Sequence, residues 1–256
     1  MRLRGYSDDV PKPMVTIGAR PILWHLMKYY AHFGHKDFVL CLGYKGNAIK
    51  DYFLHYDESI SNNFVWSEGG KNVRFLNRDI DDWTITFVET GTSANIGQRL
   101  KAVEPYVAGE DMFLANYGDG LSDLHLPTMI ETFRQSSAIA SLLLVQPTGS
   151  SDVVHTECDG IVREITPLSR TGIWINGGFF VMKTDVFRHI EAGEELVYKP
   201  FQRLIAKNAL LGYRYSGFWQ CMDTFKDKQF LEELNHDAAP WKVWNHVEQP
   251  HPVNGR

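Results

Sequence analysis

The sequence contains few cysteines and no long apolar run. Its three cysteines, Cys41, Cys158 and Cys221, are odd in number and widely spaced, which fits neither a disulfide framework nor a zinc cluster. The longest apolar runs, such as residues 138–145, are far shorter than the roughly 20 residues that span a bilayer. The N-terminal segment lacks the apolar stretch of a secretory signal. We therefore expect a cytoplasmic protein that does not bind membranes.

An excess of positive charge is also missing. The chain has 26 basic and 31 acidic residues and a pI near 6.1, which argues against binding to nucleic acid. No linker or internal repeat divides its 256 residues. We expect a single domain, with one part over about residues 1–150, a second over about 151–245, and a loose tail over 246–256.

Predicted strands and helices alternate along the chain. Apolar residues spaced three and four apart predict a helix over 21–33, and a continuous apolar run predicts a buried strand over 37–44. Similar patterns predict helices over 47–56, 98–107, 126–136, 185–193, 199–206 and 225–236, and strands over 84–90, 111–120 (ending in a turn), 139–147, 160–166, 172–182 and 210–222. The alternation indicates an α/β fold: a Rossmann-like, mostly parallel twisted sheet flanked by helices, with a smaller C-terminal portion.

Two aspartates follow predicted strands. Asp119 lies between Gly118 and Gly120 directly after an apolar strand, where open α/β sheets bind ligands. A metal or phosphate site and a plain Asp-Gly turn explain this segment equally well. Asp223 stands between a strand and a helix, where a helix N-cap is the commoner role. Together the two carboxylates could hold one Mg²⁺.

Two basic residues are candidates for phosphate contact. Lys12 lies between Pro11 and Pro13, which would hold it on a stiff extended loop. A lysine so placed suits a phosphate as a point charge, and a solvated lysine is the alternative. Arg99 begins a predicted helix after a strand and loop. It could grip a phosphate or nucleotide, or be a surface charge.

Several segments resemble one family, the sugar-1-phosphate nucleotidyltransferases, and within it the glucose-1-phosphate cytidylyltransferases. They occur in the family's order and cover nearly the whole chain. The segments are PKPMVTIGARPILWHLMKYY, FVLCLGYKG, WTITFVETG, IGQRLK, YGDG, INGGFFV, GFWQCMDTFKDK and APWKVW. Of these, WTITFVETG, GFWQCMDTFKDK and APWKVW favour the cytidylyl branch over the thymidylyl and uridylyl branches.

The resemblance implies a reaction and a set of residues. A sugar 1-phosphate, glucose 1-phosphate in this branch, would attack the α-phosphate of CTP, giving a CDP-sugar and pyrophosphate for lipopolysaccharide or polysaccharide biosynthesis. By the family pattern, Asp119 and Asp223 would hold Mg²⁺, and Lys12 would neutralise phosphate charge. We also expect a homo-oligomer.

Further roles follow from the same resemblance. Arg99 and the backbone at Gly118 would contact the nucleotide, while Asn176 and Gly177 would face the sugar. The family opens with a strand and a glycine-rich loop similar to AVILAGGLGTRL, and Arg2 matches the final arginine of that loop, where it would contact the nucleotide. Since the rest of that segment is absent, we expect unpaired backbone in the sheet, and little activity unless an upstream extension restores the loop.

The sequence departs from the family pattern at two further places, and these leave alternatives open. The family's Glu-Lys-Pro triplet before INGG is absent, so Arg163 or Arg170 would have to take its place. Ala94 stands where the family has a serine near the nucleotide. The same chemistry with UTP, dTTP or another sugar therefore remains an alternative. A non-catalytic homologue that binds nucleotide or sugar phosphate is another, although such a protein would not need both Asp119 and Asp223.

Overall fold

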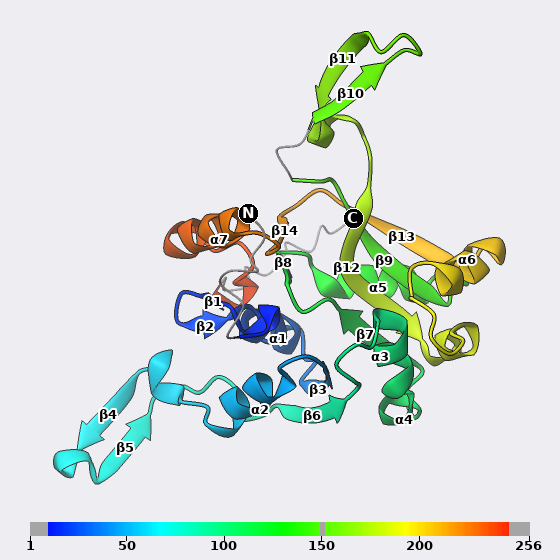
Figure 1. Cartoon of the computed structure of the whole chain (residues 1–256). Coiled ribbons are helices and arrows are strands. Elements are labelled where there is room, and N and C mark those ends of the chain that lie inside the picture. Colours follow the sequence, from blue (N-terminus) through cyan, green and yellow to red (C-terminus); the bar gives the residue numbers. More distant parts are fainter. Residues whose placement is uncertain (1–9, 149–151, 246–256) are drawn as a thin grey trace, which may run out of the picture.

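A computed structural model describes residues 10–148 and 152–245 (Figure 1). Arg2 and the tail 246–256 lie outside the described residues. The helices are α1 (Ile22–His32), α2 (Gly46–Leu54), α3 (Ile96–Ala102), α4 (Glu104–Val107), α5 (Leu126–Arg134), α6 (Lys199–Ala206) and α7 (Phe225–Asp237). The strands are β1 (Thr16–Ile17), β2 (Arg20–Pro21), β3 (Asp37–Leu42), β4 (Phe64–Ser67), β5 (Asn72–Phe75), β6 (Thr84–Glu89), β7 (Met112–Asn116), β8 (Gly120–Ser122), β9 (Ala140–Val145), β10 (Asp152–Thr156), β11 (Val162–Pro167), β12 (Ile175–Lys183), β13 (Leu210–Tyr215) and β14 (Trp219–Cys221).

The expected α/β fold is confirmed, and its main sheet is mixed. Four strands pair in the order β13-β9-β12-β7, with β13 and β9 parallel and β12 antiparallel to both of its neighbours. A separate pair, β3 and β6, is parallel. The chain leaves β9 through the β10–β11 hairpin and returns as β12, a connection that needs no crossover helix. Strands β7, β9 and β13 therefore run in the same direction and end at the same edge of the sheet.

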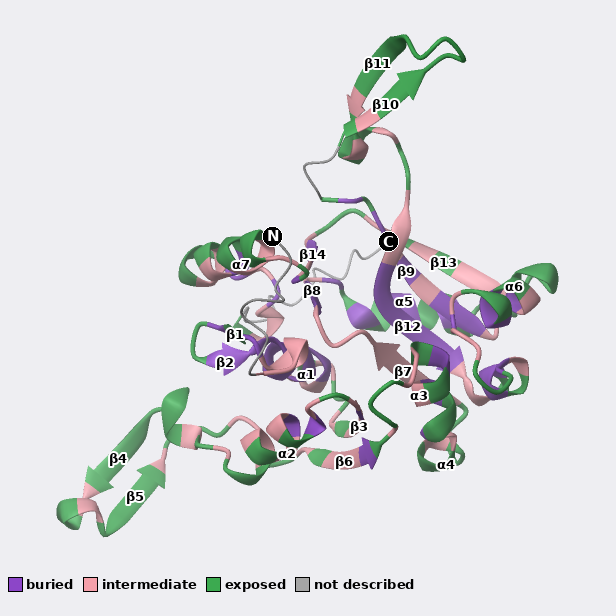
Figure 2. Ribbon diagram, viewed as in Figure 1, coloured by how far each residue is buried: buried purple, intermediate pink, exposed green. Residues whose placement is uncertain are grey.

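Helices cover both faces of this sheet. Alternate residues of β12 point to opposite sides: Phe179 and Val181 join a core with α1 and α5, and Phe180 and Met182 join a core with α3 and α6. Most residues of helix α1 are buried (Figure 2), because they pack into two core clusters. The layers thus hold the strand ends in fixed positions.

Strands β3 and β7 each have a single strand partner among the described residues. Phe38 and Leu114 pack against the core beside α1, whereas Val39 and Phe113 pack against the core on the opposite face. The two strands therefore lie between the same two layers, although no ladder joins them. This is the arrangement expected when a central strand is lacking from the described part of a sheet.

Two hairpins, β4–β5 and β10–β11, project from the body (Figure 1). The sequence patterns predicted only one of their four strands, β11, as the strand over 160–166. Figure 2 shows that both are largely exposed. On one face of β4–β5, Phe64 pairs with Phe75 and Trp66 pairs with Val73, so this face is entirely apolar.

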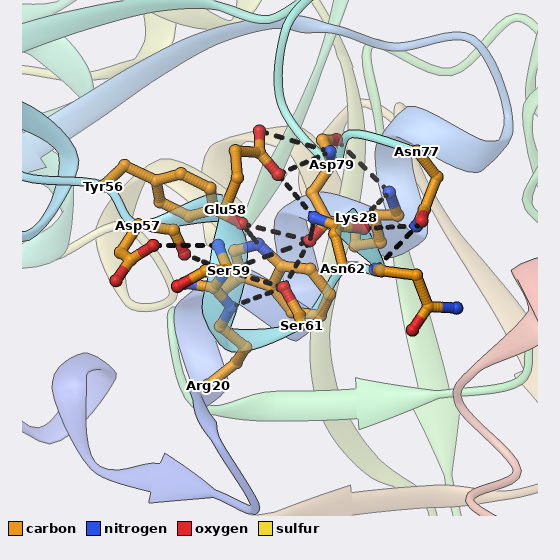
Figure 3. A network of polar contacts seen from close by, with 12 residues as sticks. Arg20, Lys28, Tyr56, Asp57, Glu58, Ser59, Ser61, Asn62, Asn77 and Asp79 are labelled. Carbon is orange, nitrogen blue, oxygen red and sulfur yellow. Dashed lines mark hydrogen bonds and ion pairs between the residues drawn. The ribbon is translucent and has the colours of Figure 1, made fainter. Parts of the chain in front are cut away.

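A buried arginine anchors the base of the β4–β5 hairpin (Figure 3). Arg20 is 3% exposed and donates hydrogen bonds to the Ser61 hydroxyl and the Asp57 carbonyl. Its guanidinium lies 4.2 Å from the centre of the Tyr56 ring, and the Asp79 carboxylate is 3.9 Å away. Because a buried guanidinium needs all of these partners, the network fixes where the hairpin leaves the body.

Three predicted elements differ from the structure. Residues 185–193 were expected to form an α-helix, but Thr184–His189 is a 3₁₀ helix. The helix predicted over 98–107 divides into α3 and α4 at Val103. Pro105, in the first turn of α4, would clash with the preceding turn of a continuous helix. The strand predicted over 210–222 is two strands, β13 and β14, in different sheets.

No helix in residues 10–148 and 152–245 has the length and apolar composition to cross a membrane. The division into a part over about 1–150 and a part over about 151–245 remains a prediction.

Helix α1 carries a buried histidine that accounts for part of the expected pH dependence of stability. His25 is 3% exposed; its Nδ1 accepts a hydrogen bond from Trp241 Nε1 at 3.3 Å. The neutral ring therefore carries its proton on Nε2, which donates to the Ile17 carbonyl at 3.0 Å. Burial lowers the pKa of His25 from 6.5 to about 4, although the bond to Ile17 opposes this shift.

We predict that the free energy of unfolding falls as the pH drops from about 6.5 to about 4. In this range the unfolded state binds a proton at His25 and the folded state does not. The loss attributable to His25 is at most about 3 kcal/mol. Urea unfolding at pH 7 and pH 5 captures about 2 kcal/mol of this loss, and the His25→Gln variant should show a smaller pH dependence. Equal pH dependence in the two proteins would contradict the assignment.

Candidate active site

Two short strands bring Asp119 and Asp223 together. Strand β8 begins directly after Asp119, and β14 ends two residues before Asp223. The strands pair antiparallel with Gly120 opposite Cys221, and the Met222 amide donates to the Asp119 carbonyl at 2.9 Å. The ladder therefore places the two aspartates side by side at its end.

The two carboxylates converge on one cation, the ammonium group of Lys12. Lys12 Nζ donates to Asp119 Oδ2 at 2.5 Å and also donates to Asp223 Oδ1. Burial works to lower the pKa of Lys12, but the charge and hydrogen bonds of the two aspartates outweigh it and raise this pKa above its usual value. Three residues predicted from separate segments thus form a single charged cluster.

The loop that carries Lys12 is a turn rather than an extended segment. Pro11 is extended, but Lys12–Met14 forms one turn of 3₁₀ helix. The fixed φ of proline is compatible with the start of a helical turn, which is why the prediction of a fully extended loop was wrong. Pro13 packs on Gly118, where an added Cβ would lie 3.2 Å from the Pro13 ring. This close contact keeps Lys12 next to Asp119.

Arg99 lies at the carboxyl ends of β3 and β6. Its Nη1 donates to the Thr90 hydroxyl at 2.8 Å, and the Thr90 hydroxyl donates to the Leu42 carbonyl. The guanidinium packs over Gly43, where a Cβ would be 2.3 Å from Arg99 Nη2. Arg99 is thus fixed at a strand end, where ligands bind in this class of fold, and it is not part of the Lys12 cluster.

Asn176 and Gly177 lie where β12 bulges away from its partner. Asn176 Nδ2 donates to the Tyr117 hydroxyl at 3.2 Å, beside the turn that carries Asp119. The Gly177 carbonyl accepts from Trp219 Nε1 at 2.8 Å. The segment INGG is therefore tied to both the Tyr117 turn and β14, although the Gly177 carbonyl already has a protein donor.

A cavity of about 310 Å³ opens at the carboxyl ends of β9 and β13. It is lined by Val145, Gln146, Pro147, Thr148, Ser169, Tyr215, Ser216, Gly217 and Trp219. The sequence analysis did not predict this cavity, because its lining comes from segments that lie far apart in the sequence.

The donor set of the cluster fits Mg²⁺. The ammonium of Lys12 shows that both carboxylates can reach one cation. Within the described ranges, no group of three or more His, Cys, Asp or Glu side chains could hold a metal. Two carboxylates nevertheless suffice for Mg²⁺, which is usually bound by one or two carboxylates together with substrate phosphates and water.

Sequence reasoning missed Gln220 and Asp227. Asp227 accepts from the Thr224 amide at 2.7 Å, and its own amide is bonded to the Thr224 hydroxyl, so the two form a capping box at the start of α7. A Thr followed three residues later by an acidic residue is the signal that could have revealed it.

This chain has relatives of known name among curated proteins. No protein-family model matches the sequence. The chain is 39% identical over 238 residues to the glucose-1-phosphate cytidylyltransferase of Salmonella typhi, covering 91% of each chain.

Solved structures show the same fold at low identity. HddC from Yersinia pseudotuberculosis has a TM-score of 0.64 at 18% identity, with 91% of this chain and 93% of that chain covered. UDP-glucose pyrophosphorylase from Acinetobacter baumanii has a TM-score of 0.63 at 16% identity, with 93% and 91% covered. On the extent and identity of the match to the Salmonella protein, this chain belongs to the glucose-1-phosphate cytidylyltransferase family.

Proposed function

We propose that this protein transfers a cytidylyl group from CTP to glucose 1-phosphate, giving CDP-glucose and pyrophosphate. The observation that carries the proposal is the Lys12, Asp119 and Asp223 cluster at the end of the β8–β14 ladder. Its charges match the needs of a phosphoryl-transfer centre, and it occurs in a chain 39% identical to a protein named for this activity.

The reaction requires positioning and charge neutralisation more than covalent chemistry by the protein. A phosphate oxygen of glucose 1-phosphate attacks the α-phosphorus of CTP, the bond to the β-phosphate oxygen breaks, and pyrophosphate leaves. Asp119 and Asp223 would hold Mg²⁺, which supplies positive charge to the phosphates when bound. Lys12 would donate hydrogen bonds to phosphate oxygens, since its ammonium already lies beside both carboxylates.

The remaining residues divide between the two substrates. We assign Arg99 and the backbone at Gly118 to the nucleotide, as the family resemblance implies. Arg99 lies at the carboxyl ends of the parallel strands β3 and β6, and Gly118 lies in the turn after β7. We assign Asn176 and Gly177 to the sugar, because their segment is tied to the Asp119 turn through Tyr117. Arg2, outside the described residues, keeps its assignment to the nucleotide. A cytoplasmic location and a role in lipopolysaccharide or polysaccharide biosynthesis complete the proposal.

Replacing Lys12 by Ala should lower turnover about 100-fold or more, since a donor to the transferring phosphate is lost. The melting temperature should change little, because a partly exposed ion pair contributes little to folding. Activity is assayed by pyrophosphate release, on this chain and on a version extended at its N-terminus by the family's strand and glycine-rich loop.

Metal binding separates the roles of the three residues. In electron paramagnetic resonance titrations with Mn²⁺, Asp119→Asn and Asp223→Asn should bind the ion more weakly. Lys12→Ala should bind it at least as tightly as wild type, because the competing ammonium is gone. Lys71→Ala, at the exposed tip of the β4–β5 hairpin, is the matched lysine control. A large drop in melting temperature with normal activity per folded molecule would make Lys12 structural.

We predict that CTP is preferred over UTP and dTTP. A pocket that hydrogen-bonds the cytosine amino group leaves a polar partner unpaired when uracil binds, which costs about 1–3 kcal/mol. This corresponds to roughly 5- to 150-fold in kcat/KM, and the serine missing at Ala94 favours the lower end. Measuring kcat/KM for each nucleotide, with a panel of sugar 1-phosphates, tests the proposal. A higher value for UTP or dTTP would reassign the base, and no turnover by the extended version would favour a non-catalytic homologue.

We also propose that the protein is a homo-oligomer. The apolar face of the β4–β5 hairpin exposes Phe64, Trp66 and Val73 at 40%, 64% and 42%. An isolated two-stranded hairpin is marginal in water, and such a face usually marks a contact with another protein. A second copy of the chain would cover it.

Light scattering should therefore give a mass above 29.3 kDa for the wild type. Trp66→Lys should shift the mass towards the monomer. Val65→Lys, on the opposite face of the same strand, should leave it unchanged. A monomeric wild type would contradict the proposal.

A further inference from the structure

We propose that Asp227 is a positioning residue that orients the Asp223 carboxylate for metal binding. The proposal rests on the proposed function, in which Asp223 is a ligand of Mg²⁺. Asp227 Oδ2 accepts from the Asp223 amide at 3.1 Å, from the Thr224 amide at 2.7 Å and from the Thr224 hydroxyl at 2.8 Å. One carboxylate oxygen thus holds the backbone on both sides of the bond between Asp223 and Thr224.

The Asp223 side chain is largely exposed, so the position of its backbone sets where the carboxylate points. The side chain is 64% exposed and stands in the connection between β14 and α7. Its carboxylate accepts from the Lys12 ammonium and from the Cys221 thiol, whose Sγ is 3.3 Å from Asp223 Oδ2. Asp223 would lose its contact with Lys12 when the Lys12 ammonium binds a phosphate instead. The backbone clamp from Asp227 would then keep the carboxylate facing Asp119.

Asp227 is itself braced from β14. Its Oδ1 accepts from Gln220 Nε2 at 3.3 Å, and Gln220 is only 6% exposed. Gln220 Nε2 also donates to the Cys221 carbonyl, and its Oε1 accepts from the Thr148 hydroxyl at 3.2 Å. A chain of hydrogen bonds therefore runs from Thr148, in the lining of the cavity, through Gln220 and Asp227 to the Asp223 backbone.

The positioning role is separable from helix capping. The capping box of α7 consists of the bonds between Thr224 and Asp227. The bond to the Asp223 amide lies one residue outside this box, so capping alone does not require it. Thr224→Ala removes the hydroxyl that accepts from the Asp227 amide. It leaves the amides of residues 223 and 224 bonded to the Asp227 carboxylate. Asp227→Asn keeps an oxygen that accepts from those amides, whereas Asp227→Ala removes it.

The test compares these three variants by Mn²⁺ affinity, measured by electron paramagnetic resonance, and by melting temperature. Asp227→Ala should raise the Mn²⁺ dissociation constant about tenfold or more, as loss of a residue that orients a metal ligand does. Asp227→Asn and Thr224→Ala should stay within about threefold of wild type, since the amides remain held. Thr224→Ala should nevertheless melt at about the same temperature as Asp227→Ala, because each variant loses one half of the capping box.

Hydrogen exchange at the Asp223 amide supplies a readout that needs no metal. It should speed up in Asp227→Ala and stay slow in Thr224→Ala. Unchanged Mn²⁺ affinity in Asp227→Ala would overturn the inference and leave the proposed function standing. The same holds if Thr224→Ala weakens Mn²⁺ binding as much as Asp227→Ala does. A wild-type protein that binds no Mn²⁺, with or without CTP, overturns the metal role of Asp223 in the proposed function and this inference with it.

Discussion

The three-residue β8–β14 ladder is the constraint on which the site depends. It joins Gly120 to Cys221 and continues through the bond from the Met222 amide to the Asp119 carbonyl. Two carboxylates held this close repel each other unless a cation lies between them. Lys12 supplies that cation, and the packing of Pro13 on Gly118 keeps it there. Backbone pairing, one close glycine contact and one ammonium group thus assemble the charged centre.

The layers around the sheet explain why this centre is accessible. Strands β7, β9 and β13 end at one edge, while α1 and α5 cover one face and α3 and α6 cover the other. Loops rather than helices therefore cover the strand ends, and both the Asp119 turn and the cavity at β9 and β13 lie there. The hairpins β4–β5 and β10–β11 project outward from the body (Figure 1).

Local sequence patterns predicted the elements whose apolar spacing is strongly periodic. They were wrong where contacts with distant segments set the backbone conformation. The apolar spacing in 21–33 predicted α1 closely, and the apolar run at 37–44 predicted β3. Residues 185–193 have helical spacing, but the chain forms the 3₁₀ helix Thr184–His189 there, directly after the end of β12. The pattern in 210–222 is continuous, yet the chain turns near Gly217 and joins two sheets. The local pattern also did not decide the backbone of the Pro11–Pro13 segment, since proline is compatible with both an extended and a turned conformation.

The sequence by itself determined the α/β class and the residue types of the site. Alternating apolar periods specify strands and helices, and the family segments single out Lys12, Asp119 and Asp223. Only the tertiary structure decided that the two carboxylates meet at one ammonium group, that Arg99 lies apart at β3 and β6, and that Asp227 reaches the Asp223 amide. The physical reason is that these relations depend on strand pairing between distant segments, whose register no local propensity encodes.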